Sequence, residues 1–271
     1  MPRYDRLSIL VTLVLFGLVV SHIVDLPTRT ISFVALGVPT TIYLSGRWFI
    51  GGLLVVMTGA GVDSIVRSHP QARKEGWGWG HSLSFWGLPC ALTLLSLVVL
   101  PLSPDIVSWL AALTFTGLGL VLIVTAQYYA IDRQARHTAV VDWGLSLAAY
   151  VVIFVFSALT YASRARSLLS ATAIAIICAA LAAELLRPHS SELSLRRAWL
   201  YAGVVGLVLG EVAWALNHLS LSAAAGGVLF LLIFYALGGL AKQYLRGQLG
   251  RPEIVEFAVV SILGLGLLYL M

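Results

Sequence analysis

The stretch IVSWLAALTFTGLGLVLIVTAQYYAI, residues 106–131, contains no charged side chain and decides the fold class. A helix of about 20 consecutive apolar residues is long enough to cross the roughly 30 Å hydrocarbon core of a bilayer. A backbone inside a bilayer must satisfy its own hydrogen bonds, and a helix does so within one segment. The stretch therefore predicts a transmembrane helix.

The whole chain shares this character. Of its 271 residues, 59% are apolar and 11% are charged, whereas an average soluble domain has about 25% charged residues. So few polar groups cannot cover the surface of a water-soluble protein of this size. The two cysteines, Cys90 and Cys178, lie in apolar runs, which indicates neither a disulfide framework nor a zinc site. These features exclude a disordered protein, a disulfide scaffold and an ordinary soluble enzyme.

Similar apolar stretches recur along the chain, and we expect an all-α, polytopic membrane protein with about ten transmembrane helices. The second stretch is the weakest, because it is short and contains Gly37 and Pro39, which would fit a kinked or partial span. The expected spans are residues 7–24, 30–46, 48–66, 83–101, 106–131, 138–161, 167–186, 198–217, 221–241 and 253–271.

Lysine and arginine side chains predict the orientation, because basic loops stay on the cytoplasmic side of a membrane. The loops after the third, fifth, seventh and ninth spans hold eleven of them, whereas those after the fourth, sixth and eighth hold only two. The net charge of +5 fits basic loops that face anionic lipid better than nucleic-acid binding. We expect a multi-pass protein of the plasma or inner membrane, with residues 67–82, 132–137, 187–197 and 242–252 in the cytoplasm.

The side of the N-terminus depends on the second stretch. With ten full spans, Arg3 and Arg6 lie outside, against the charge rule. If residues 30–46 do not cross, the N-terminus moves to the cytoplasmic side. We expect ten spans, since Arg29 and the residues after it precede Gly37 much as Arg136 and its successors precede Gly144.

The order of polar landmarks indicates an internal repeat. Arg67 and His69 at the end of the third span match Arg187 and His189 after the seventh at an offset of 120, and each pair follows a carboxylate by about one turn. We therefore expect two parallel four-helix units, spans 3–6 and 7–10, after an N-terminal hairpin. The expected units are residues 1–46, 47–161 and 162–271. Further matching landmarks are Gln127-Tyr128 with Gln243-Tyr244, and Asp142 with Glu256.

The same landmarks are the first candidate site. Asp63 with Arg67 and Glu184 with Arg187 have the spacing of ion pairs on one helix face, which is the simplest interpretation. Alternatively, the two ends form one paired site for an anionic lipid or a small anion, because a guanidinium suits phosphate or carboxylate and histidine adds a titratable donor. The candidate ligand-binding residues are Arg67, His69, Arg187, His189, Asp63 and Glu184.

Glu211 is the second candidate, because it lies inside the eighth span with no basic residue within one turn. A glutamic acid that is protonated and bonded to a neighbouring helix would explain it, and so would a proton- or cation-coupled site with Asn217 and His218. Gly206 and Gly210 have the spacing of a close helix contact, which favours burial of Glu211 in the bundle.

The function itself is not encoded in a motif that we can read. The chain lacks the nucleophile elbow, the Walker loop, the zinc-protease motif and the C-x-x-C pair, so we assign no catalytic residue, metal ligand or cofactor. A transporter-like or small-ligand- or lipid-binding bundle is the leading hypothesis. A non-catalytic subunit or assembly factor with membrane-protein partners, and a membrane-embedded lipid-modifying enzyme, are the alternatives.

Overall fold

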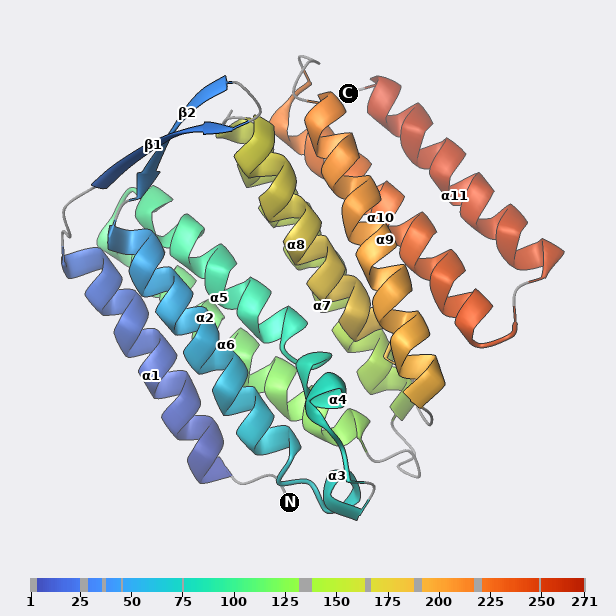
Figure 1. The fold of residues 1–271 in the computed structure, drawn as a ribbon, viewed down its shortest axis with the longest axis horizontal. Helices are drawn as coiled ribbons and strands as arrows, with labels where there is room; N and C mark the ends of the chain where they lie inside the picture. Colours follow the sequence, from blue (N-terminus) through green and yellow to red (C-terminus); the bar gives the residue numbers. More distant parts are fainter. Residues whose placement is uncertain are drawn as a thin grey trace.

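The protein is a bundle of long helices that lie side by side and alternate in direction along the chain (Figure 1). The structure is a computed structural model, and it describes residues 4–24, 29–35, 38–44, 46–74, 76–131, 138–163, 167–187, 192–216, 221–248 and 250–270. The long helices are α1 (Tyr4–Ile23), α2 (Gly46–Val66), α5 (Gly87–Val99), α6 (Ile106–Ala130), α7 (Thr138–Ala162), α8 (Ser167–Leu185), α9 (Glu192–Leu216), α10 (Ala223–Leu245) and α11 (Arg251–Leu270).

Shorter elements complete the described chain. Helices α3 (Pro70–Lys74) and α4 (Trp79–Leu83) connect α2 to α5, and the 3₁₀ turn η1 (Leu100–Leu102) follows α5. Strands β1 (Arg29–Ala35) and β2 (Val38–Leu44) lie between α1 and α2.

Six of the described helices are long and apolar enough to cross a membrane. They are α1, α2, α6, α7, α9 and α10, and shorter apolar segments lie in α5, α8 and α11. Large apolar side chains point outward on several helices: Phe49 on α2, Phe115 on α6 and Ile176 on α8 are 72%, 75% and 68% exposed. A soluble protein rarely exposes apolar surface on this scale, whereas lipid would cover it. The fold is that of a membrane-embedded helical bundle.

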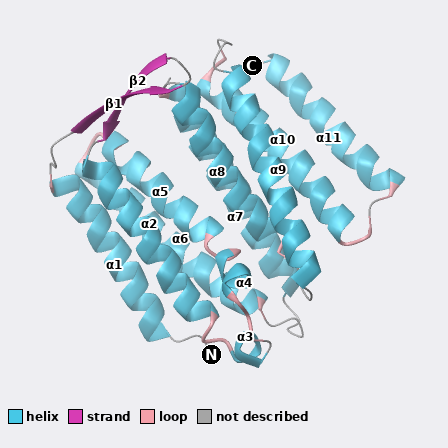
Figure 2. Ribbon diagram, in the orientation of Figure 1, coloured by secondary structure: helices cyan, strands magenta, loops and turns pink. Residues whose placement is uncertain are grey.

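The expectation of a transmembrane helix over residues 30–46 is wrong. The described residues Arg29–Ala35 and Val38–Leu44 pair as antiparallel strands, in which Arg29 pairs with Leu44 and Ala35 with Val38 (Figure 2). The segment is rich in β-branched residues, which favour strands over helices, and Pro39 cannot donate a backbone hydrogen bond. Apolarity alone does not distinguish a short strand pair from a short span.

The hairpin settles how the first two helices are related. The chain leaves α1, turns through the strands and enters α2 at the same end of the bundle, so α1 and α2 are antiparallel neighbours (Figure 1). At the other end, the Arg6 guanidinium donates hydrogen bonds to the Ser64 carbonyl and hydroxyl oxygens at 3.1 and 2.6 Å. The start of α1 therefore lies beside the end of α2, and the chain termini lie at opposite ends of the bundle (Figure 1).

We call the end that holds the start of α1, helices α3 and α4, and the adjoining ends of α6 to α11 the basic end, at the bottom of Figure 1. Ten of the described lysine and arginine residues lie there, whereas Arg29 and Arg47 lie at the opposite end. The basic-end residues are Arg6, Arg67, Arg73, Lys74, Arg187, Arg196, Arg197, Lys242, Arg246 and Arg251.

Two apolar clusters form the core. One joins α1, α2, α5 and α6, and the other joins α5 and α6 to α7, α8, α9 and α10. Helices α8 and α9 approach closely, because a Cβ on Gly206 would lie 2.5 Å from the Ala175 carbonyl oxygen. Helix α7, which the sequence assigns to the first four-helix unit, shares its core with α8 to α10. The division into two repeated units stays a prediction.

Candidate ligand-binding cleft

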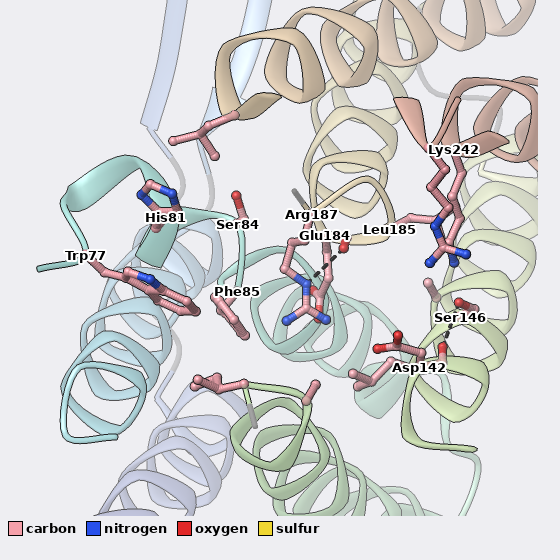
Figure 3. A pocket seen from close by; sticks show the side chains of 16 residues that line it. Trp77, His81, Ser84, Phe85, Asp142, Ser146, Glu184, Leu185, Arg187 and Lys242 are labelled. Carbon is pink, nitrogen blue, oxygen red and sulfur yellow. Dashed lines mark hydrogen bonds and ion pairs between the residues drawn. The ribbon is translucent and has the colours of Figure 1, made fainter. Parts of the chain in front are cut away.

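A cleft of about 800 Å³, its open mouth included, lies at the basic end. Its walls come from the segment between α3 and α5 and from the adjoining ends of α6, α7, α8, α9 and α10 (Figure 3). An aromatic side is formed by Trp77, His81 and Phe85, and a charged side brings together residues that lie far apart in the sequence. The charged residues are Asp142, Glu184, Arg187, Lys242 and Arg246.

Glu184 is the buried member of this charged group. Its Oε2 accepts a hydrogen bond from the Leu88 backbone N–H at 2.6 Å, and its Oε1 accepts one from the Gln127 amide. Leu88 lies in the first turn of α5, where backbone N–H groups have no partner within the helix and the helix dipole favours negative charge. Both carboxyl oxygens of Glu184 therefore accept hydrogen bonds from N–H donors.

Gly87 allows this contact. A Cβ at this position would lie 2.3 Å from the Ala180 carbonyl oxygen, so only glycine lets the start of α5 approach the backbone of α8. Gln127 of α6 also donates to the Phe85 carbonyl oxygen at 2.9 Å, which ties the segment just before α5 to the same cluster. The contacts of Glu184 and Gln127 thus join α5, α6 and α8 at the inner side of the cleft.

Arg187 lies between the buried cluster and the aromatic side. Its Nε donates to the Glu184 carbonyl oxygen at 3.0 Å, and its Nη2 lies 3.9 Å from Glu184 Oε1. The guanidinium carbon lies 4.2 Å from the centre of the Phe85 ring, a cation–π distance. Burial lowers the pKa of Arg187, and the charges of Glu184 and Asp142 oppose that effect. Arginine stays charged in proteins, so the cleft keeps this cation.

Lys242 and Arg246 add positive charge from α10. Lys242 lies in the last turn of the helix, and Arg246 is its C-terminal cap. Asp142 of α7 attracts both Lys242 and Arg187 electrostatically, and in Figure 3 its carboxylate lies below Lys242. Three cations and two carboxylates therefore line the cleft, a net charge of +1 with His81 neutral.

The aromatic side is ordered by stacking. The rings of Trp77 and His81 stack at 5.6 Å between centroids, and Trp77 also packs against Phe85 at 5.9 Å. None of these three residues is predicted as a site residue from the sequence, because no motif or spacing links them to the distant end of α8.

Arg67 and Asp63 do not line the cleft. Arg67 Nε donates to Asp63 Oδ1 at 2.9 Å and to the Ser82 hydroxyl at 3.2 Å, and its guanidinium lies 4.7 Å from the Trp79 ring. The two residues form the local ion pair that their spacing predicts. This pair holds α4 against the end of α2.

His69 has a packing environment of its own. Its ring meets Tyr128 edge-on at 4.6 Å, and its Nδ1 accepts a hydrogen bond from the Gln71 backbone N–H at 3.2 Å. Of the six residues of the first candidate site, Glu184 and Arg187 line the cleft, Asp63, Arg67 and His69 do not, and His189 lies outside the described residues. The described residues of that set therefore do not form one paired site.

Glu211 is exposed on α9, so the expectation that it is buried in the bundle is wrong. Gly206 and Gly210 do face α8, as their spacing predicts, since a Cβ on Gly210 would lie 2.9 Å from the Ala175 Cβ. Successive helical residues differ in direction by about 100°, so Glu211 points away from this contact and shares its face with the exposed Trp214. Asn217 and His218 lie outside the described residues.

Comparison with known proteins gives a family and no activity. No curated protein and no solved structure matches the chain. The model of one protein family, described as a protein of unknown function, matches residues 26–271, from the segment before β1 to the C-terminal residue. The chain therefore belongs to the DUF5656 family.

Proposed function

We propose that this protein binds an anionic head group in the cleft at its basic end, as a lipid-binding or small-anion-binding membrane protein. The observation that carries the proposal is the convergence of Arg187, Lys242 and Arg246 on one cleft. Guanidinium groups recognise phosphate and carboxylate oxygens with paired hydrogen bonds, and a lysine adds a mobile point charge. These cations come from the ends of two helices that are far apart in the sequence.

The apolar side of the cleft supports an amphiphilic ligand. Trp77, Phe85, Leu145 and Leu195 line it together with the charged group. Ligand sites are mostly apolar with a few polar groups that fix orientation. A lipid would place its phosphate against the cations and the first part of its apolar chain against these side chains.

The distribution of charge supports an orientation. We place the basic end, with residues 67–82, 132–137, 187–197 and 242–252, on the cytoplasmic side of a plasma or inner membrane. The cytoplasmic leaflet carries anionic lipids, and basic loops remain on that side. The hydrogen bonds of Arg6 to Ser64 support the same side for the start of α1.

The exposure of Glu211 favours binding over coupled transport. A coupling residue needs a buried path between the two sides, and Glu211 lies on the outer face of α9. Transport, a role as a subunit with membrane-protein partners, and modification of a bound lipid remain alternatives. They predict, in turn, movement of the ligand across the bilayer, co-purified chains, and a chemically altered lipid.

Native mass spectrometry of the detergent-purified protein with added phosphatidylglycerol tests the proposal. The double variant Lys242→Gln/Arg246→Gln should lose most of the lipid adducts, by about tenfold or more. Arg196→Gln/Arg197→Gln is the matched control, because it removes the same charge from exposed residues of α9 that do not line the cleft. Equal lipid binding by the cleft variant and this control would refute the proposal.

A further inference from the structure

The cleft contains a carboxylate that an anion-binding site does not need. Asp142 projects from the first part of α7 into a group of cations, and its backbone carbonyl accepts the Ser146 hydroxyl at 2.8 Å. In Figure 3 the carboxylate faces the side of Lys242 and Arg187, where an anionic head group would bind. A negative charge at this place opposes the binding of any anion, so its presence calls for a chemical reason.

Glu184 does not raise the same question. Its charge is matched by the Leu88 backbone N–H, by the Gln127 amide and by Arg187, and its side chain is buried behind the cleft. Its role is to hold three helices together. Asp142 is instead half-buried on the surface of the cleft, and its charge attracts Arg187 and Lys242, two of the cations that would receive the ligand.

We propose that Asp142 sets the charge of the ligand, so that the cleft selects a head group with a single negative charge, a phosphodiester, over a phosphomonoester or a diphosphate. This inference rests on the proposed function. The five charged side chains of the cleft sum to +1, so one negative charge on the ligand neutralises the site. A second negative charge would meet the carboxylate of Asp142 with no further cation of the described cleft to offset it.

The local electrostatics agree with this assignment. Arg246 and Arg187 repel Lys242, and Asp142 attracts it. Without Asp142 three cations would face one another across the empty cleft, which suits a ligand with two or more charges. With Asp142 the empty cleft is nearly balanced, and a singly charged ligand is enough to complete it.

The test compares two lipids that differ in head-group charge. Phosphatidylglycerol carries one negative charge. Phosphatidic acid carries nearly two at pH 8, because a phosphomonoester loses its second proton at about pH 6. We expect the wild-type protein to prefer phosphatidylglycerol at pH 8. Asp142→Asn should shift the ratio of the two affinities toward phosphatidic acid by about tenfold, and Asp142→Glu should keep the wild-type preference.

Asp105→Asn is the matched control, because it makes the same charge change at an exposed site next to α6 at the opposite end of the bundle. An Asp142→Asn protein that keeps the wild-type ratio, or a wild-type protein that prefers phosphatidic acid, would overturn the inference. If both lipids bind Lys242→Gln/Arg246→Gln as well as wild type, the proposed function itself fails, which is a different outcome.

A second measurement needs no variant. The affinity of the wild-type protein for phosphatidic acid, divided by that for phosphatidylglycerol, should fall by about tenfold as the pH rises from 5 to 8 and the monoester gains its second charge. His81 on α4 lines the cleft together with Glu184, Arg187, Lys242 and Arg246. A change in the charge of any of these side chains acts on both lipids, so the ratio of the two affinities isolates the charge of the head group. If the ratio of the two affinities stays constant between pH 5 and pH 8, the cleft does not select its ligand by charge.

The same experiment separates two sources of the ligand. Glycerophosphoglycerol carries the phosphodiester without acyl chains, so its binding measures the head-group contacts alone. If it binds as tightly as phosphatidylglycerol, the ligand is a soluble phosphodiester. If it binds at least tenfold more weakly, the apolar side of the cleft holds an acyl chain. The selection by charge is expected in either case.

Discussion

The Glu184 carboxylate at the end of α8 accepts a hydrogen bond from the backbone N–H of Leu88 at the start of α5, at 2.6 Å. The two residues are 96 positions apart in the sequence. A carboxyl group buried at a helix start supplies the hydrogen-bond acceptor that the first turn lacks, and it lies at the positive end of the helix dipole. This contact fixes the inner side of the cleft.

Removal of this carboxylate should destabilise the protein strongly. Glu184→Ala removes the acceptor of the buried Leu88 N–H, one of the two acceptors of the Gln127 amide and the ion-pair partner of Arg187. Loss of one partner of a buried ion pair typically costs about 3–5 kcal/mol. Thermal unfolding in detergent, followed by tryptophan fluorescence, measures the change. Glu211→Ala should unfold like wild type, because Glu211 is exposed. Similar unfolding temperatures for the two variants would show that the Glu184 contacts do not stabilise the fold.

The close approach of α5 and α8 should tolerate no side chain at residue 87. A Cβ there would lie 2.3 Å from the Ala180 carbonyl oxygen, so Gly87→Ala should force the helices apart and cost about 1–3 kcal/mol. Gly144→Ala on α7 is the matched control. No atom lies within 4 Å of its added Cβ, and alanine favours a helix over glycine by up to about 1 kcal/mol. Equilibrium unfolding in mixed micelles should give a lower free energy of unfolding for Gly87→Ala than for wild type, and a higher one for Gly144→Ala. If Gly87→Ala leaves the free energy of unfolding unchanged, α5 and α8 do not approach as closely as the structure shows.

The hairpin predicts a topology that labelling can test. After replacement of Cys90 and Cys178 by alanine, single cysteines at Asp5 and Gln248 should react with a membrane-impermeant maleimide from the same side of the membrane, and one at Leu102 from the other. All three positions are exposed, so a lack of reaction reports the membrane and not burial. If the Asp5 and Gln248 positions react from opposite sides, residues 30–46 cross the membrane and the hairpin is excluded.

Acid should weaken the start of α6 through Asp105. Its carboxylate accepts hydrogen bonds from the Ser108 hydroxyl at 2.9 Å and from the Ser108 and Val107 N–H groups at 3.1 Å, which together lower the pKa of Asp105. A carboxyl group with a lowered folded-state pKa stabilises the fold above its unfolded value of about 3.9, and this contribution disappears as the pH falls through the folded-state pKa.

Unfolding temperatures measured between pH 6 and pH 3 check this effect. Asp105→Asn keeps a good helix cap without a titratable group, so its unfolding temperature should fall less in acid than that of the wild type. Parallel pH profiles for the two proteins would mean that Asp105 is not the group responsible.

Local composition predicted most of the helices. Residues 106–131 were expected as one span and form α6 over Ile106–Ala130, and residues 48–66 form α2 over Gly46–Val66. A run of apolar residues bounded by prolines, glycines or charges carries its own hydrogen bonds in a helix, so its ends are visible in the sequence. The Asp63–Arg67 ion pair has the same origin, because both residues lie on one helix.

Short apolar segments and helix faces were less predictable. A short apolar segment can form either a strand pair or a short span, and apolarity alone did not show that Arg29–Ala35 and Val38–Leu44 pair as strands. The helix face on which Glu211 lies was also predicted wrongly. The Gly206–Gly210 spacing identified the face of α9 that meets α8, yet a residue one position further along the helix points elsewhere.

The sequence by itself determined that this chain is an apolar helical bundle, where most of its helices begin and end, and that its charges gather at one end. Those properties follow from the solvation of each segment taken alone. Only the tertiary structure decided that Glu184 meets Leu88, that Arg67 and Arg187 lie in separate environments, and that Asp142 joins Arg187, Lys242 and Arg246 around one cleft. Contacts between segments that are about 50 to 100 residues apart depend on how whole helices pack, and no local pattern records that packing.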